Sequence, residues 1–180
     1  MRWVTFMVCA AGMLTLQSTI APRVELIGCR PDWLLVLVVY LAMFVRPVDA
    51  VAGAWILGAC ADLMTIERPG LLALSYMMAA LCVAASREYF FRYRTATQVV
   101  VTAITCLFVH AGWWIYHNVL YGATSSLLGS LTVEVIGTSL YTAVWGLVWF
   151  KILTRISGAL GVGRPRYTYS GLHRLEEARV

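Results

Sequence analysis

Charged side chains are scarce in this chain of 180 residues, which carries nine Asp and Glu and fourteen Lys and Arg, or 13% of the total. Soluble domains carry about 25%. Hydrophobic residues reach 61%, and the mean hydropathy is +0.76. So few charges cannot cover the surface of a water-soluble globule of this size. The composition therefore excludes soluble, disordered, collagen-like and coiled-coil proteins, and it predicts an all-α chain solvated largely by lipid.

The motifs of common catalytic and metal sites are missing as well. The sequence contains no Gly-x-Ser-x-Gly elbow, no Gly-x-x-x-x-Gly-Lys phosphate loop and no His-Glu-x-x-His pair. Its five cysteines have no Cys-x-x-Cys spacing and are expected to be small core residues. We therefore expect no enzyme activity, no cofactor and no metal site.

Long apolar stretches are what the sequence does contain. A helix that crosses about 30 Å of hydrocarbon needs about 20 mostly apolar residues. Six stretches predict a six-helix membrane domain over residues 1–155, followed by a basic, flexible tail at 156–180. They lie at residues 3–22, 33–45, 51–63, 69–86, 97–121 and 131–150. The first stretch also fits a cleaved signal peptide, but five further spans make a retained helix the simpler interpretation.

The basic residues predict the orientation of these six spans. Only Arg23, Arg30 and Arg68 fall in the odd-numbered loops, and the other Lys and Arg residues fall at the termini or in the even-numbered loops. Because cytoplasmic loops are enriched in Lys and Arg, both termini are predicted to be cytoplasmic. The positive charge therefore suits a bilayer with an anionic inner leaflet, and it gives no reason to expect nucleic acid as a partner.

The triplet Arg30-Pro31-Asp32 precedes a purely apolar stretch that is too short to cross a bilayer alone. Proline suits the first turn of a helix, and an aspartate beside it faces the positive end of the helix dipole. The triplet therefore predicts a helix start below the outer membrane surface. A buried docking or binding feature is the alternative interpretation.

A row of small residues marks the third stretch. Ala50, Ala54, Gly58 and Asp62 are spaced by four and lie on one helical face, with Gly53 alongside. Small residues let two helix backbones approach closely inside a membrane. The row predicts a tight helix contact in which Asp62 forms a hydrogen bond across the interface. A proton or ion site at Asp62 is the alternative.

Four polar residues have a similar predicted depth near the outer membrane face. Asp32, Asp62, His117 and Glu134 therefore define a candidate outward-facing polar recess. His110 and His117 are seven residues apart and share a helix face. Two histidines alone are weak support for a metal, which needs three or four ligands, so polar contacts inside the bundle are favoured.

One ordered set of motifs resembles a known family. Pro31-Asp32-Trp33-Leu34-Leu35 is followed by a segment from Gly53 to Gly58, by Ala61-Asp62-Leu63, and by Pro69-Gly70-Leu71 ahead of Leu74-Ser75-Tyr76. This set, spread over about forty-five residues, resembles the rod shape-determining protein MreD family, and the length and the six spans agree.

The resemblance implies a non-enzymatic subunit of the bacterial cell-elongation complex in the inner membrane. Its implied partners are MreC, the MreB filament, the polymerase RodA and a transpeptidase, and its implied role is to help direct lateral peptidoglycan synthesis. The family is also similar in fold to the substrate-capture subunits of vitamin transporters of the energy-coupling type.

The sequence allows two interpretations of the partner contact and two alternatives to this function. We expect the outer ends of spans two and three, with Arg30, Pro31, Asp32, Ala50, Gly53, Ala54, Gly58, Asp62, Pro69 and Gly70, to pack against helices or to receive a partner. A transport subunit that binds a small solute in the outward recess is the main alternative. An intramembrane enzyme that uses His110 or His117 is the third.

Overall fold

The computed structural model describes residues 3–26, 28–64, 70–87, 95–121 and 135–156. These ranges contain six α-helices and no strand, which confirms the all-α class. The helices are α1 (Trp3–Thr19), α2 (Trp33–Phe44), α3 (Pro47–Met64), α4 (Leu71–Ser86), α5 (Thr95–Tyr121) and α7 (Thr138–Ile156), and a short 3-10 helix, η1 (Ala21–Val24), follows α1. Each helix coincides with one of the six predicted stretches.

Three of these helical segments are long and apolar enough to cross a membrane. They are Pro47–Met64, Thr95–Tyr116 and Val135–Ile156, whereas α1, α2 and α4 are shorter apolar helices. The last segment continues to Ile156 rather than ending at residue 150 as predicted. Lys151 and Arg155 do not stop it because both are exposed, and long basic side chains near a helix end can extend toward the membrane surface.

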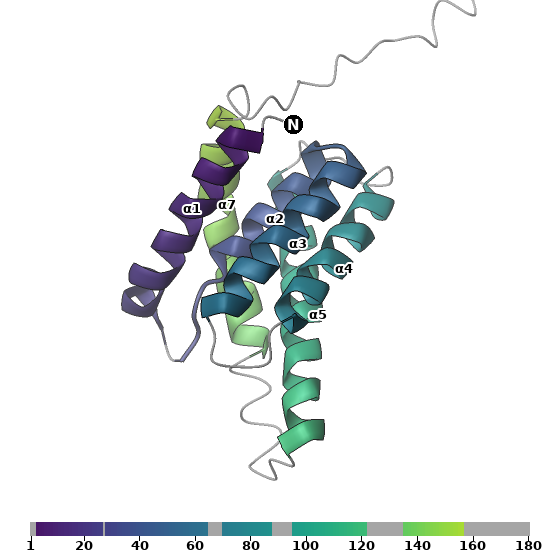
Figure 1. The fold of residues 1–180 in the computed structure, drawn as a ribbon. Helices are drawn as coiled ribbons and strands as arrows, with labels where there is room; N and C mark the ends of the chain where they lie inside the picture. Colours follow the sequence, from purple (N-terminus) through teal and green to yellow (C-terminus); the bar gives the residue numbers. More distant parts are fainter. Residues whose placement is uncertain (1–2, 27, 65–69, 88–94, 122–134, 157–180) are drawn as a thin grey trace, which may run out of the picture.

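Helix α2 is the centre of the bundle. Eleven of its twelve residues are buried, from Trp33 to Met43. It packs against α1, α3, α4, α5 and α7. Figure 1 shows α2 between α1 and α7 on one side and α4 on the other, with α3 in front of it. A helix surrounded in this way need not span the hydrocarbon itself, which explains how so short a helix is accommodated.

Aromatic side chains fix α2 against α7. The ring of Trp33 lies 5.5 Å from that of Trp145 and 5.7 Å from that of Trp149. Further along the pair, Tyr40 packs edge-on against Phe150, with ring centroids 5.7 Å apart, and its hydroxyl donates a hydrogen bond to the carbonyl of Leu153 at 3.2 Å. Pairs of this kind add about 0.5–1.5 kcal/mol each beyond the area that they bury.

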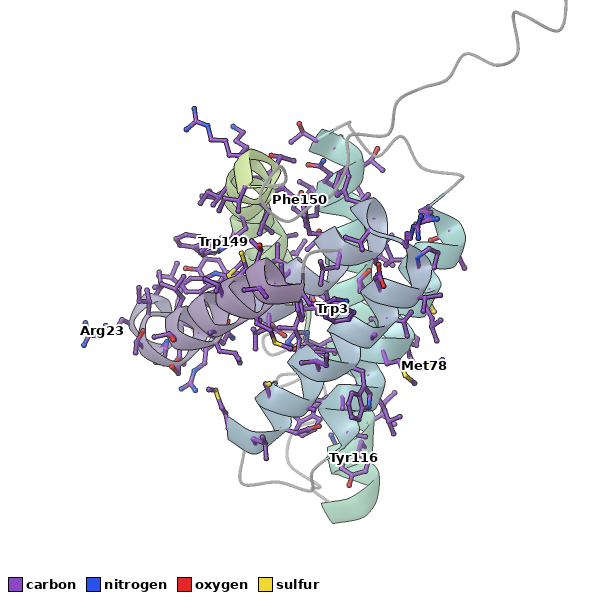
Figure 2. The ribbon with its side chains drawn as sticks, turned by 45° about the horizontal axis from the view of Figure 1, so that its top comes forward. Trp3, Arg23, Met78, Tyr116, Trp149 and Phe150 are labelled. Carbon is purple, nitrogen blue, oxygen red and sulfur yellow. The ribbon has the colours of Figure 1, made fainter. Side chains whose placement is uncertain are left out.

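The outer surface of the bundle is apolar. Large exposed hydrophobic side chains follow α5 and α7, including Ile104, Phe108, Val144 and Val148. Figure 2 shows Met78 of α4 at the periphery, whereas Arg23 extends away from the bundle at the end of η1. Figure 1 also shows that α1 begins and α7 ends at the same end of the bundle.

Helices α3 and α4 approach each other closely and pack together over much of their length. A Cβ added to Gly58 would lie 2.5 Å from Ala73 Cα and 2.7 Å from the Leu72 carbonyl oxygen. Only glycine fits there. Of the two alternatives left open for Gly58, this geometry favours helix packing within the chain, because α4 occupies its face.

The Gly58→Ala substitution is expected to destabilise the folded protein by about 1–3 kcal/mol, since backbone atoms of α4 would have to move to accept the methyl group. Its matched control is Gly12→Ala on α1, where an added Cβ would meet no atom within 4 Å. Thermal unfolding of the purified protein in detergent measures both. An unchanged midpoint for Gly58→Ala would contradict the close approach.

Candidate functional site

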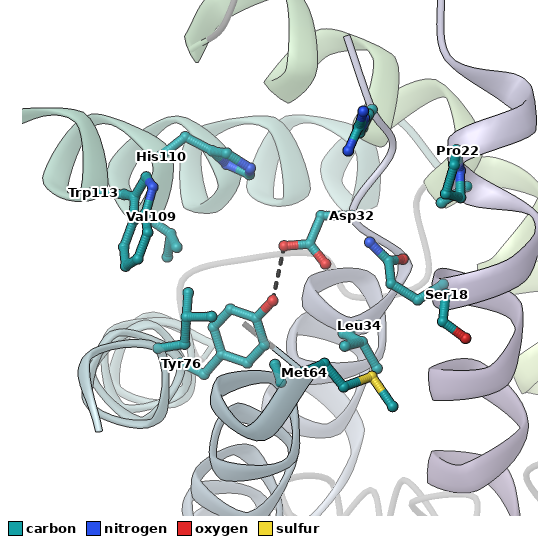
Figure 3. A pocket seen from close by; sticks show the side chains of 14 residues that line it. Ser18, Pro22, Asp32, Leu34, Met64, Tyr76, Val109, His110 and Trp113 are labelled. Atoms are coloured by element: carbon teal, nitrogen blue, oxygen red, sulfur yellow. Dashed lines mark hydrogen bonds between the residues drawn. The ribbon is translucent and has the colours of Figure 1, made fainter. Parts of the chain in front are cut away.

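The start of α2 is held by the carboxylate of Asp32. Its Oδ1 accepts a hydrogen bond from the Leu35 N–H at 3.1 Å, which caps the helix, and its Oδ2 accepts one from the Tyr76 hydroxyl of α4 at 2.8 Å (Figure 3). An N-terminal cap satisfies one of the backbone donors that a helix leaves unpaired. Asp32 therefore both begins α2 and ties it to α4.

Gln17 and Thr142 complete this polar cluster from two other helices. The Gln17 side chain of α1 donates to the Pro31 carbonyl at 3.1 Å and accepts from the Trp33 N–H at 2.9 Å. The Thr142 hydroxyl of α7 accepts from the Asp32 N–H at 3.0 Å. We call Gln17, Asp32, Tyr76 and Thr142 the Asp32 cluster. It joins α1, α2, α4 and α7 at one point.

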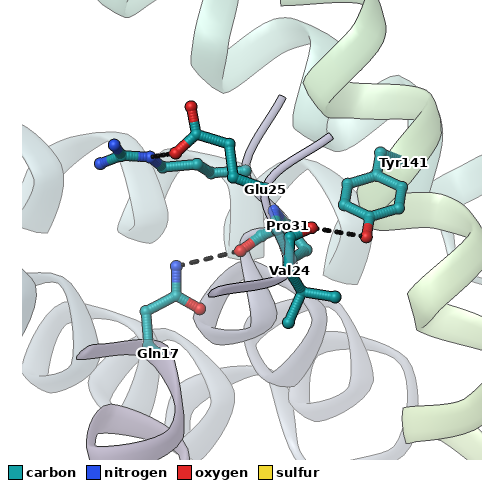
Figure 4. Close-up of polar contacts among 6 residues, drawn as sticks. Gln17, Val24, Glu25, Pro31 and Tyr141 are labelled. Carbon is teal, nitrogen blue, oxygen red and sulfur yellow. Dashed lines mark hydrogen bonds and ion pairs between the residues drawn. The ribbon is translucent and has the colours of Figure 1, made fainter. Parts of the chain in front are cut away.

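The segment between η1 and α2 is fastened by two contacts drawn in Figure 4. The Tyr141 hydroxyl donates to the Val24 carbonyl at 2.8 Å, and Arg30 forms an ion pair with Glu25 at 2.6 Å. Because 64% of the Arg30 side chain is exposed, this ion pair contributes little to stability. Arg30 also lines the cavity described below.

Asp62 forms a second polar contact between helices. Only 4% of its surface is exposed, and its carboxylate accepts hydrogen bonds from the N–H groups of Gly70, Leu72 and Ala73 at 2.9, 3.1 and 3.0 Å. These are unpaired donors at the start of α4. Gly70 itself has φ +107°, a left-handed conformation that favours glycine. Asp62 therefore caps α4 from the end of α3.

A cavity of about 610 Å³ lies beside the Asp32 cluster. Figure 3 shows His110 and Trp113 of α5 on one side of it and Ser18 and Pro22 on the other. Asp32 and Tyr76 line the space between them. Its volume is within the range of sites that bind small molecules. We call it the Asp32 cavity.

The residues of the predicted recess are distributed differently from the expectation. Asp32 lines the Asp32 cavity, whereas Asp62 is not among its lining residues and is engaged at the start of α4. His110 lines the cavity. The side chain of His117 and the whole of Glu134 lie outside the described residues, so their part in a recess stays a prediction.

The remaining candidate residues either pack against neighbouring helices of the same chain or lie outside the described residues. Ala50 and Ala54 are fully buried, and a Cβ at Gly53 would lie 3.4 Å from side chains of Leu41 and Phe6. Pro31 is buried, and its carbonyl accepts from Gln17. Pro69 and the predicted tail after residue 156 lie outside the described residues. The small-residue face of α3 therefore contacts neighbouring helices of the same protein.

The described polar groups act as helix connectors. Within these ranges no group of three His, Cys, Asp or Glu side chains is arranged to hold a metal ion. Neither Gln17 nor Thr142 was predicted from the sequence, and Tyr76 was noted only as part of a motif. A glutamine inside a charge-free apolar stretch was a usable signal for Gln17, because polar groups in lipid need partners. Thr142 gave no comparable signal.

The family model described as rod shape-determining protein MreD matches residues 1–156. No curated protein and no solved structure matches the chain. The matched range includes all six described helices, the Asp32 cluster and Asp62, so the resemblance seen in the motifs is confirmed.

Replacing Asp62 by alanine is expected to destabilise the protein by on the order of 2 kcal/mol, because three N–H donors at the start of α4 lose their acceptor. Asp49→Ala, in the first turn of the same helix and away from the start of α4, is the matched control for loss of a carboxylate, and it should lower the free energy of unfolding less than Asp62→Ala does. Denaturant titration in detergent measures both variants. Equal losses would show that the cap of α4 is unimportant.

Proposed function

The chain belongs to the MreD family of rod shape-determining membrane proteins, and we propose that it is a non-catalytic subunit of the bacterial cell-elongation complex that binds MreC. The observation that carries this proposal is the family match over residues 1–156, which include all six described helices. RodA, its partner transpeptidase and the MreB filament are the other proposed members of the complex. The proposed outcome is directed lateral peptidoglycan synthesis and a rod-shaped cell.

The use of the polar side chains supports a non-catalytic role. Asp32 and Asp62 accept hydrogen bonds from backbone N–H groups of the bundle, and Gln17 and Thr142 do the same. Groups occupied in this way position helices and leave specificity to the surfaces that other proteins contact. We therefore propose that the protein helps to assemble the complex rather than to catalyse a reaction.

We propose that both termini lie on the cytoplasmic side of the inner membrane. The start of α1 and the ends of α2, α4 and α7 share one end of the bundle in Figure 1. The connections at that end and the last two turns of α7 carry Arg46, Arg87, Lys151 and Arg155, whereas Arg23 and Arg30 belong to the other end. The distribution of basic residues supports this orientation.

The partner surface is proposed to lie outside α2, because α2 has no exposed face to offer. A groove of about 340 Å³ runs between α4 and α5 and is lined almost entirely by apolar atoms. Leu74 and Met78 form one side, and Phe108, Gly112 and Ile115 form the other. An added Cβ at Gly112 would meet no atom within 4 Å, so a second helix backbone can approach there. We place the transmembrane helix of MreC in this groove.

Gly112→Leu is expected to reduce co-purification of MreC at least tenfold, because the new side chain would extend into the groove from a position where its Cβ meets no atom within 4 Å. Gly12→Leu on α1 is the matched control, since Gly12 is equally open and lies on another helix. Both variants should insert and unfold like the wild type. Quantitative pull-down from membranes measures the capture.

Cell shape provides the second measurement. Cells that depend on the Gly112→Leu variant should lose their rod shape, while cells with Gly12→Leu keep it. Unchanged MreC capture by Gly112→Leu would reject the groove as the contact. Failure of the wild-type protein to capture MreC at all would reject the proposed function itself.

A further inference from the structure

The Asp32 cavity presents hydrogen-bond acceptors. Each carboxylate oxygen of Asp32 accepts one hydrogen bond, from the Leu35 N–H or from the Tyr76 hydroxyl. A carboxylate oxygen can accept two. Asp32 therefore retains acceptor capacity toward the cavity that it lines.

His110 adds another acceptor from the α5 side of the cavity. Its Nδ1 lies 2.8 Å from the carbonyl oxygen of Cys106. Because a carbonyl only accepts, Nδ1 donates in this contact, and in a ring with one proton that proton lies on Nδ1. The other nitrogen, Nε2, is then a hydrogen-bond acceptor. A ligand that bears N–H donors matches both walls.

The walls between these acceptors are aromatic and apolar. The rings of Tyr76 and Trp113 and the side chains of Leu34 and Val109 line the cavity. Aromatic faces attract cations, most strongly where water is excluded. The one cationic side chain of the lining, Arg30, is paired with Glu25 at 2.6 Å and is exposed at the rim. The pairing offsets its charge, so the interior favours a cation over an anion.

We propose that the Asp32 cavity binds a primary ammonium group. Such a group offers three N–H donors, which suit the two oxygens of Asp32 and Nε2 of His110, and its charge is neutralised by Asp32 inside a bundle where an unpaired charge is costly. Trp113 and Tyr76 provide the aromatic walls. Both the ethanolamine headgroup of a membrane lipid and a free amine carry this chemistry. The inference does not depend on the partner contact proposed above.

Titration of the purified full-length protein with short-chain phospholipids tests the proposal. Lipids with ethanolamine, choline and glycerol headgroups are compared by native mass spectrometry and by the unfolding midpoint. The ethanolamine lipid should bind most tightly, the choline lipid more weakly because it has no N–H donor, and the glycerol lipid at least tenfold more weakly than the first. A parallel titration with free ethanolamine separates the two possible sources of the ammonium group. Binding of the lipid but not of ethanolamine identifies the lipid headgroup as the ligand, whereas binding of both identifies the amine itself.

Three variants locate the binding. Asp32→Asn, His110→Leu and Trp113→Leu should each weaken binding of the ethanolamine lipid several-fold. The last two variants keep the test valid if the loss of the Asp32 carboxylate unfolds the protein. Asp49→Asn and Trp55→Leu are the matched controls, because Asp49 lies in the first turn of α3 and Trp55 is 51% exposed on the same helix. Equal binding of the ethanolamine and glycerol lipids, or wild-type binding by both His110→Leu and Trp113→Leu, would overturn the proposal.

Discussion

The packing of this protein depends on how both ends of a buried helix are satisfied. A helix leaves donors unpaired at its start and acceptors unpaired at its end, and inside a bundle no bulk water can pair them. At the start of α2, Asp32 accepts the Leu35 N–H and Gln17 accepts the Trp33 N–H. At the other end, Arg87 donates to the Val45 carbonyl at 2.8 Å. These three side chains lie outside α2 and belong to the segments next to it. The hydrogen bonds that pair the backbone groups at the ends of α2 therefore also position those segments.

The same requirement explains why the polar residues act between helices. Lipid tails are as apolar as leucine, so helices gain little by hiding apolar faces from them, and close packing and hydrogen bonds must hold the bundle together. Tyr76 connects α4 to α2 through Asp32, and Asp62 connects α3 to α4. Gly58 permits the close approach that brings Asp62 to the start of α4. Gly58 and Asp62 of α3 are therefore parts of one contact with α4.

The sequence predicted the helices well and their arrangement poorly. Spans are local features, because charge-free runs and turn residues mark them directly, and all six coincide with helices. Hydropathy does not distinguish a helix buried by protein from one that faces lipid, so nothing marked α2 as central. The link between Asp32 and Tyr76 joins residues 44 positions apart, and that between Asp32 and Thr142 joins residues 110 positions apart. Such pairings depend on helix packing, which spacing along one helix cannot reveal.

The Asp32 cavity follows from the unequal lengths of the helices. Helix α2 has 12 residues and is about 18 Å long, whereas α5 has 27 residues and is about 40 Å long. A short central helix inside longer neighbours leaves space beyond its end unless the neighbours converge. Helix α1 contacts α2 and α3, and no contact joins the described parts of α1 and α5, so the two do not close over the start of α2. The hollow therefore forms where Asp32 begins the helix, which places a carboxylate at its base.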